Sequence, residues 1–93
     1  MATPKITIFS TATCPFCKME KAFLKEKGVS FEERSVDVDQ SSAEEMVKLT
    51  NQMGVPVTVL EYDDGSKTCF IGFRQELLEK SLTGVKVGEP CRD

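Results

Sequence analysis

Short apolar runs alternate along the chain with longer stretches in which apolar residues recur at helical spacing. Four runs rich in β-branched and aromatic residues predict strands, at residues 5–10, 29–38, 57–62 and 67–71. Three stretches with helical periodicity predict helices, at residues 15–27, 43–51 and 75–82. The pattern therefore predicts an α/β protein with the element order βαβαββα.

The connections between these elements set their relative directions. A helix joins the first two strands, which makes them parallel, whereas the turn signal at 63–66 makes the last two an antiparallel hairpin. Thr13 is a suitable N-cap for the first helix, and Ser41 and Ser42 can cap the second. The tail at 85–93 is expected to be extended or loosely ordered.

Length and charge limit the class of protein. Ninety-three residues suffice for one compact domain, 1–93, with its core at about 5–82 and a tail at 85–93. A net charge of −3 argues against nucleic acid as the main partner. The apolar runs are too short to cross a membrane, and the N-terminus lacks the apolar region of a secretion signal. We therefore expect a cytoplasmic protein that binds neither nucleic acid nor membrane.

The most informative chemistry lies in Cys14-Pro15-Phe16-Cys17, at the start of the first predicted helix. Two cysteines three positions apart lie one helical turn apart, so their sulfurs can form a disulfide and reopen it. Half a zinc site and an inert pair are the alternatives. A zinc site would need a second pair or histidines, and the chain has no histidine. The pattern favours redox chemistry and no metal.

The two cysteines are expected to differ. Cys14 is nearer the helix N-terminus, where free backbone N–H groups favour a thiolate. Cys17 lies one turn further and should stay protonated and more buried. We therefore expect Cys14 to attack and Cys17 to resolve, with Phe16 pointing outward and Lys18 and Lys21 adding positive potential.

Several other residues allow both a purely structural interpretation and a functional one, and the functional one is the sharper of the two. Pro56 either begins an ordinary strand or forms a cis bond that exposes the Val55 backbone to an incoming peptide. Cys69 is expected to be a small core residue. Cys91 is expected to be an exposed thiol, with a second redox role or an intermolecular disulfide as alternatives. Arg74 lies at the start of the last predicted helix, where it is either solvent-exposed surface or a contact with a partner.

Three segments together resemble the glutaredoxin family, namely 10–21 (STATCPFCKMEK), 52–57 (QMGVPV) and 71–74 (IGFR). The resemblance covers about residues 5–82, and the pairing of CPxC with a downstream Val-Pro is its specific part. The branch it resembles is the small glutaredoxin-like redoxins, including those that serve ribonucleotide reductase. The resemblance implies a thioredoxin fold, with a four-stranded mixed sheet flanked by three helices.

The resemblance also implies an activity and a site. The activity is that of a dithiol–disulfide oxidoreductase, which reduces protein or glutathione mixed disulfides with Cys14 as nucleophile and Cys17 as resolving thiol. It implies that Pro56 is cis and that the Val55 backbone pairs with the substrate. The substrate-binding residues implied by position are Thr13, Pro15, Phe16, Val55, Pro56, Gly72, Phe73 and Arg74.

The electron donor stays open at this point. Glutathione-using members commonly carry a basic residue just before the motif and a double glycine with acidic residues before the last helix. This chain has 11–13 (TAT) and 71–74 (IGFR) there, which resembles the redoxins reduced by thioredoxin reductase. Arg74 could still hold a glutathione carboxylate. The donor is therefore glutathione or a thioredoxin-reductase-type flavoprotein, with no tightly bound cofactor.

We expect a monomeric redoxin that acts on disulfide-containing proteins. The resemblance suggests ribonucleotide reductase as one of these partners. Two other functions fit the same motifs. One is a carrier of an iron–sulfur cluster or metal, in which Cys14 and glutathione bridge a cluster between two chains. The other is a non-catalytic binding module that uses the Val55-Pro56 groove.

Overall fold

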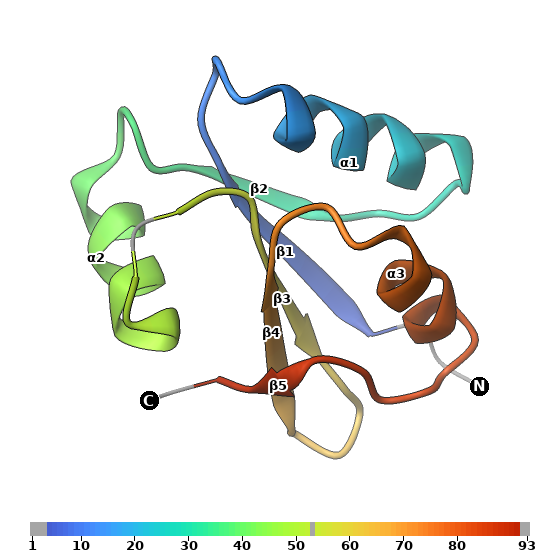
Figure 1. Ribbon diagram of the computed structural model, residues 1–93. Coiled ribbons are helices and arrows are strands. Elements are labelled where there is room, and N and C mark those ends of the chain that lie inside the picture. The colour runs from blue at the N-terminus through green and yellow to red at the C-terminus, as the bar shows by residue number, and fades with distance from the viewer. Residues whose placement is uncertain (1–3, 53, 92–93) are drawn as a thin grey trace.

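The structure is a computed structural model that describes residues 4–52 and 54–91. The predicted domain and tail also include residues 1–3, 53 and 92–93, which lie outside the described part. The strands are β1 (Lys5–Ser10), β2 (Glu32–Ser35), β3 (Val57–Glu61), β4 (Lys67–Ile71) and β5 (Glu89–Pro90). The helices are α1 (Pro15–Glu26), α2 (Gln40–Thr50) and α3 (Gln75–Leu82). Figure 1 shows their arrangement around one sheet.

The strands form one mixed sheet in the order β2-β1-β3-β4-β5. β1 and β2 are parallel, and β1–β3 and β3–β4 are antiparallel, as the sequence predicts. The predicted count of four strands is wrong, because the described residues form five. The additional strand lies in the tail, where Glu89 and Pro90 pair with Cys69 and Thr68 on β4. This pairing covers a sheet edge that would otherwise carry open N–H and C=O groups.

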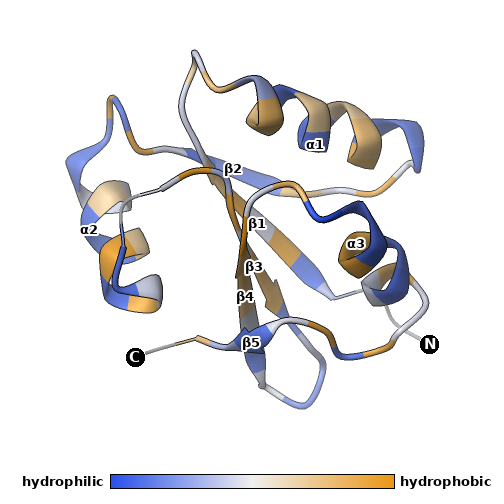
Figure 2. Cartoon of the chain, in the orientation of Figure 1, coloured by the Kyte–Doolittle hydropathy of each residue, from blue (hydrophilic) through white to orange (hydrophobic). Residues whose placement is uncertain are grey.

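Helices cover both faces of the sheet, α1 and α3 on one and α2 on the other (Figure 1). The period of two in a strand explains the separation, since Ile8 and Phe9 of β1 point to opposite faces. Ile8 packs in a cluster with Leu24 of α1, whereas Phe9 packs with Met46 of α2. Figure 2 shows hydrophobic and hydrophilic residues alternating along each of the three helices.

Two elements, β2 and α2, differ from their predicted bounds by more than one residue. β2 is shorter than the predicted strand at 29–38, which includes loop residues on either side. α2 begins earlier than predicted because Asp39 is its N-cap, with its carboxylate accepting from the Ser41 N–H at 3.2 Å. The two serines are donors to this cap, since both hydroxyls donate to Asp39.

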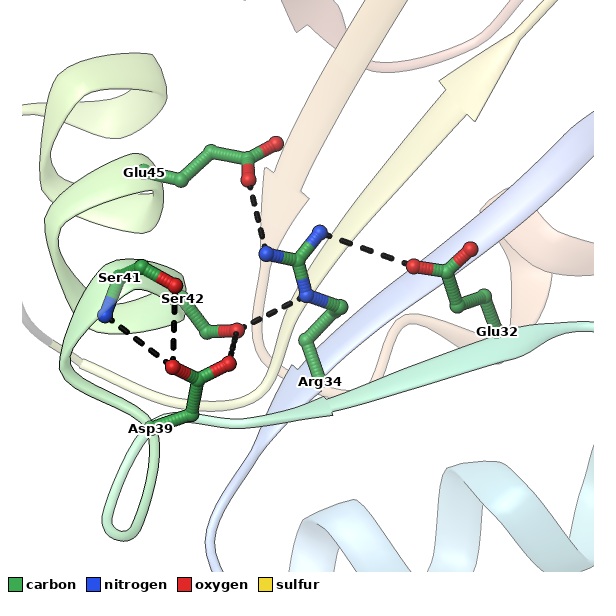
Figure 3. Close-up of polar contacts among 6 residues, drawn as sticks. All are labelled: Glu32, Arg34, Asp39, Ser41, Ser42 and Glu45. Carbon is green, nitrogen blue, oxygen red and sulfur yellow. Dashed lines mark hydrogen bonds and ion pairs between the residues drawn. The ribbon is translucent and has the colours of Figure 1, made fainter.

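A charged network holds α2 against β2 (Figure 3). The Arg34 Nε donates to the buried Ser42 hydroxyl at 2.8 Å, and Arg34 also pairs with Glu45 at 3.0 Å and Glu32 at 3.6 Å. The guanidinium carbon lies 5.7 Å from the centre of the Phe9 ring. The Glu32 and Glu45 side chains are about half exposed, so each of these ion pairs is worth about 0.2–1 kcal/mol. The network therefore helps to fix the position of α2 relative to β2.

Candidate active site

The candidate site begins where β1 ends and α1 starts. Cys14 is the N-cap of α1 and Pro15 is its first residue, so the expectation that Thr13 caps the helix is wrong. The physical reason is that Pro15 has no N–H and a fixed φ suited to the first helical position. No side chain bonds the free N–H groups at this helix end. The Cys14 side chain therefore lies beside the free backbone N–H groups at the start of α1.

A proline loop lies against the Cys14 sulfur. The Val55–Pro56 peptide bond is cis, which confirms the sharper interpretation of this dipeptide. The Cys14 thiol donates to the Val55 carbonyl oxygen at a sulfur–oxygen distance of 3.9 Å. The Gly72 N–H donates to the Pro56 carbonyl oxygen at 2.7 Å. Three segments far apart in the sequence thus meet at the carboxyl end of β1.

The two motif cysteines have different surroundings, as predicted. Both are free thiols, and Cys14 is half-buried whereas Cys17 is 0% exposed. Burial raises the pKa of Cys17 to about 12, and its hydrogen bond with the Cys14 thiol adds to the increase. Cys17 is therefore protonated at neutral pH and must lose a proton before it can react.

A buried carboxyl group lies one turn beyond Cys17. Glu20 is 0% exposed, its Oε2 accepts from the Thr58 hydroxyl, and its Oε1 has no hydrogen-bond partner. Burial raises the pKa of Glu20 from 4.5 to about 7. The sequence interpretation missed this residue. The available signal was helical spacing, since positions 17, 20 and 24 share one face of α1.

The other predicted site residues lie at different depths. Thr13, Pro15 and Phe16 are exposed, and the Phe16 side chain is 57% exposed beside Cys14. Phe73 is half-buried because its ring packs edge-on against Phe23 of α1, with 5.9 Å between ring centres. Arg74 is the exposed N-cap of α3. It also lines a surface cavity together with Cys69 and Pro90.

Of the two lysines expected to add positive potential, one is already paired. The Lys21 Nζ lies 2.6 Å from a carboxylate oxygen of Glu33, and the Ser10 hydroxyl donates to that same oxygen at 3.0 Å. This pairing lowers the pKa of Glu33. Lys21 therefore supplies little net positive charge to the cysteines, and Lys18 stays exposed.

The expectations for the other two cysteines need correction. Cys69 is buried, as predicted, but it forms a disulfide with Cys91, with their Cα atoms 5.3 Å apart. Cys91 is therefore not the exposed thiol expected from its polar surroundings. The pairing of β5 with β4 brings Cys91 beside its partner, and the Cys91 N–H donates to the Lys67 carbonyl at 3.4 Å.

Neither a metal centre nor a membrane span is found in the described part of the chain. Within residues 4–52 and 54–91, no three His, Cys, Asp or Glu side chains are grouped to hold a metal ion. None of the helices described there is both long and apolar enough to cross a membrane.

A mixed sheet covered by helices on both faces, with Cys-x-x-Cys at the start of α1 beside a cis-proline, defines a redoxin of the thioredoxin fold. The family model of glutaredoxin matches residues 6–63. The chain belongs to the glutaredoxin family, whose members are in general thiol–disulfide oxidoreductases.

Relatives and solved structures agree with this assignment. The chain is 40% identical to an uncharacterised glutaredoxin-like 8.6 kDa protein in the rubredoxin operon of Clostridium pasteurianum, over 83% of this chain and 96% of that protein. It is 41% identical to glutaredoxin 3 of Escherichia coli, over 55% of this chain and 61% of that protein. The structure of NrdH-redoxin from Escherichia coli superposes with a TM-score of 0.69 at 25% identity, covering 82% of this chain and 92% of that chain.

Proposed function

We propose that this glutaredoxin-like protein is a dithiol–disulfide oxidoreductase in which Cys14 is the nucleophile and Cys17 the resolving thiol. One observation carries the proposal. The half-buried Cys14 sulfur lies at the N-cap of α1, 3.9 Å from the Val55 carbonyl, while Cys17 is fully buried one turn further. An accessible sulfur beside helix N–H groups suits the attacking role, and a protonated sulfur beneath it suits the second step.

The exchange proceeds in two steps. The Cys14 thiolate attacks one sulfur of a substrate disulfide, so that a bond between Cys14 and that sulfur forms and the other substrate sulfur leaves as a thiolate. The Cys17 sulfur, after losing its proton, then attacks Cys14. A Cys14–Cys17 disulfide forms and the second substrate thiolate leaves, so two electrons pass from protein to substrate.

The substrate groove we propose runs between the motif and the proline loop. Its motif side carries exposed apolar surface, since Phe16, two residues after Cys14, is 57% exposed. This surface suits disulfide-containing proteins, and ribonucleotide reductase is the partner that the likeness to small redoxins suggests. Thr13, Pro15, Val55, Pro56, Gly72, Phe73 and Arg74 complete the proposed substrate contacts. A cytoplasmic location belongs to the proposal, because the exchange uses up the motif dithiol and a reducing compartment supplies the electrons that regenerate it.

We propose that the electron donor is a flavoprotein of the thioredoxin-reductase type, with glutathione as the competing donor. The support is the segment at 71–74, which has IGFR where glutathione-using members have a double glycine. The NrdH-redoxin structure is described as having a thioredoxin-like activity profile. Parallel assays with NADPH and thioredoxin reductase, and with glutathione and glutathione reductase, test the choice. Faster turnover with glutathione would reverse it.

Two substitutions test the mechanism. Cys14→Ser is expected to abolish reduction of a protein disulfide, because no thiolate remains at the groove. Cys17→Ser is expected to accumulate a mixed disulfide on Cys14, which non-reducing mass spectrometry detects. Full activity in Cys14→Ser would overturn the proposed mechanism.

A further inference from the structure

Glu20 is a buried ionisable group that the exchange described above does not use. It lies on the same face of α1 as Cys17, three residues further along, and both side chains are 0% exposed. A carboxyl group is rarely found so deeply buried without a charged partner. Leucine at this position would complete the apolar face of α1 without any desolvation cost.

The hydrogen bonding of Glu20 is incomplete on one side. Oε2 accepts from the Thr58 hydroxyl of β3, which orients the carboxyl group, and Oε1 is buried without a partner. Leaving a buried acceptor unpaired costs about 1–3 kcal/mol. Thr58 lies close in sequence to Val55, whose carbonyl contacts the Cys14 thiol. The carboxyl group is thus hydrogen-bonded to β3, the strand that continues directly from the loop facing the reactive sulfur.

Cys17 presents a proton-transfer problem that this carboxyl group can solve. Burial raises the pKa of the Cys17 thiol to about 12, so water at neutral pH does not deprotonate it readily. The negative charge of Glu20 is the smallest of the causes that contribute to this increase in the pKa of Cys17. Burial also raises the pKa of Glu20 to about 7, so both its ionised and protonated forms are populated near neutrality.

The buried residues on the face of the sheet that α1 covers are uncharged. On β1, β3, β4 and α3 they are Ile6, Ile8, Ser10, Thr58, Leu60, Phe70, Leu78 and Ser81. Lys21, the residue after Glu20 on α1, pairs with Glu33 of β2 at 2.6 Å, so these two charges offset one another. Cys17 is therefore the titratable group with which Glu20 interacts on this face.

We propose that Glu20 accepts the proton of Cys17 in the resolving step and returns it when the pair is reduced again. This role rests on the proposed function. As the Cys17 sulfur bonds to Cys14, the bond between Cys14 and the substrate sulfur breaks and its electron pair leaves on the substrate thiolate. The Cys17 proton moves to the Glu20 carboxylate. When an electron donor dithiol later reduces the Cys14–Cys17 disulfide, the proton moves back to the Cys17 sulfur.

Glu20→Gln in the full chain tests this role, because the amide keeps the shape and can still accept from Thr58 but cannot take up a proton. The measurement follows a peptide mixed disulfide on Cys14 as it converts to the Cys14–Cys17 disulfide, by acid quenching and mass spectrometry between pH 5.5 and 9. In the wild type this rate is expected to rise with pH through an inflection near 7, as Glu20 ionises. In Glu20→Gln the rate should fall by about 100-fold and the inflection should disappear.

The rate of the first step, in which Cys14 attacks the substrate disulfide, distinguishes a proton-transfer role of Glu20 from a structural one. The rate at which Cys14 attacks the peptide disulfide should be unchanged in Glu20→Gln, and Glu20→Asp should partly restore the resolving rate. Equal slowing of both steps, or a resolving rate equal to wild type at every pH, would overturn the role of Glu20. The wild-type profile is decisive if the variant fails to fold, since a profile without the inflection also overturns it. Failure of the wild type to form any Cys14 mixed disulfide would instead overturn the proposed function, and the role of Glu20 with it.

Discussion

The chain holds two cysteine pairs whose surroundings differ in almost every respect. Cys14 and Cys17 lie one turn apart at the start of α1 and are free thiols. Cys69 and Cys91 lie 22 residues apart and form a disulfide between β4 and the end of the tail. The first pair lies beside helix N–H groups, a proline loop and a buried carboxyl group. The second lies at the edge of the sheet.

The difference teaches that surroundings, more than the presence of two sulfurs, decide what a pair can do. Beside Cys14 lie the N-terminal end of α1 and the Val55 carbonyl, with Cys17 and Glu20 buried one and two turns further along α1, an arrangement that suits the exchange chemistry proposed above. Around Cys69 and Cys91, backbone pairing brings two segments together, and the disulfide encloses α3 and the Gly72-Phe73 segment in one loop. We therefore assign chemistry to the first pair and stabilisation of the fold to the second.

The largest expected effect distinguishes the pairs by activity. The double variant Cys14→Ser/Cys17→Ser should lose reduction of a protein disulfide completely, because the attacking thiolate is absent. Cys69→Ser/Cys91→Ser should keep most of the wild-type turnover, measured by NADPH consumption in the thioredoxin reductase assay. A loss of similar size in both double variants would end the division of roles.

The two pairs should differ in the opposite way in their effect on the free energy of unfolding. Closing a loop of this separation stabilises the folded state by about 3 kcal/mol, so Cys91→Ser should lower the free energy of unfolding by about that amount. Cys14→Ser, at a half-buried position, should change it by less than about 0.5 kcal/mol. Urea unfolding without reductant measures both. Identical midpoints for Cys91→Ser and wild type would show that the disulfide contributes no stability.

The buried carboxyl group beneath the reactive pair should make stability depend on pH. Because the pKa of Glu20 is raised from 4.5 to about 7 on folding, the folded state binds the proton more tightly. Its contribution is complete below pH 4.5 and is lost as pH rises through 7, a loss of about 3 kcal/mol relative to Glu20→Gln. Urea unfolding of both proteins at pH 4.5, 6 and 8 checks this. Parallel pH dependences would contradict the assigned burial.

The smallest expected effect concerns the surface beside the reactive pair. Phe16→Ala should raise KM for a protein disulfide by about tenfold, since an aromatic anchor in an interface is worth about 1–2 kcal/mol. Reduction of a small disulfide should change little. Val85→Ala is the matched control, because Val85 is similarly exposed, at 50% against 57%, and lies between α3 and β5. Equal effects of the two substitutions would remove Phe16 from the proposed groove.

The sequence predicts most of the fold because most of its elements have strong local signals. β1, β4 and α3 match their predicted bounds, and α1 ends within one residue of its prediction. These segments combine clear periodicity with prolines and glycines at their ends. The different burial of Cys14 and Cys17 follows from their positions at the start of α1. The cis peptide bond was one of two interpretations of the residues, and the resemblance to the glutaredoxin family chose between them.

What the sequence did not predict depends on contacts between distant segments. β5 contains only Glu89 and Pro90, too few residues to show a period, and it exists because it pairs with β4. The disulfide of Cys91 follows from that pairing. Glu20 looks like one more charged residue of a lysine-rich helix until the position of Thr58 is known. Tertiary structure alone turns these residues into a fifth strand, a disulfide and a buried acid.

The central claim is that Cys14 is the attacking thiol. The most direct measurement is labelling of the wild-type protein at pH 7 with less than one equivalent of iodoacetamide, followed by peptide mass mapping. The account predicts label on Cys14, with Cys17 protected by burial and protonation and with Cys69 and Cys91 protected by their disulfide. Label on Cys17 before Cys14, or equal labelling of the two, would contradict it.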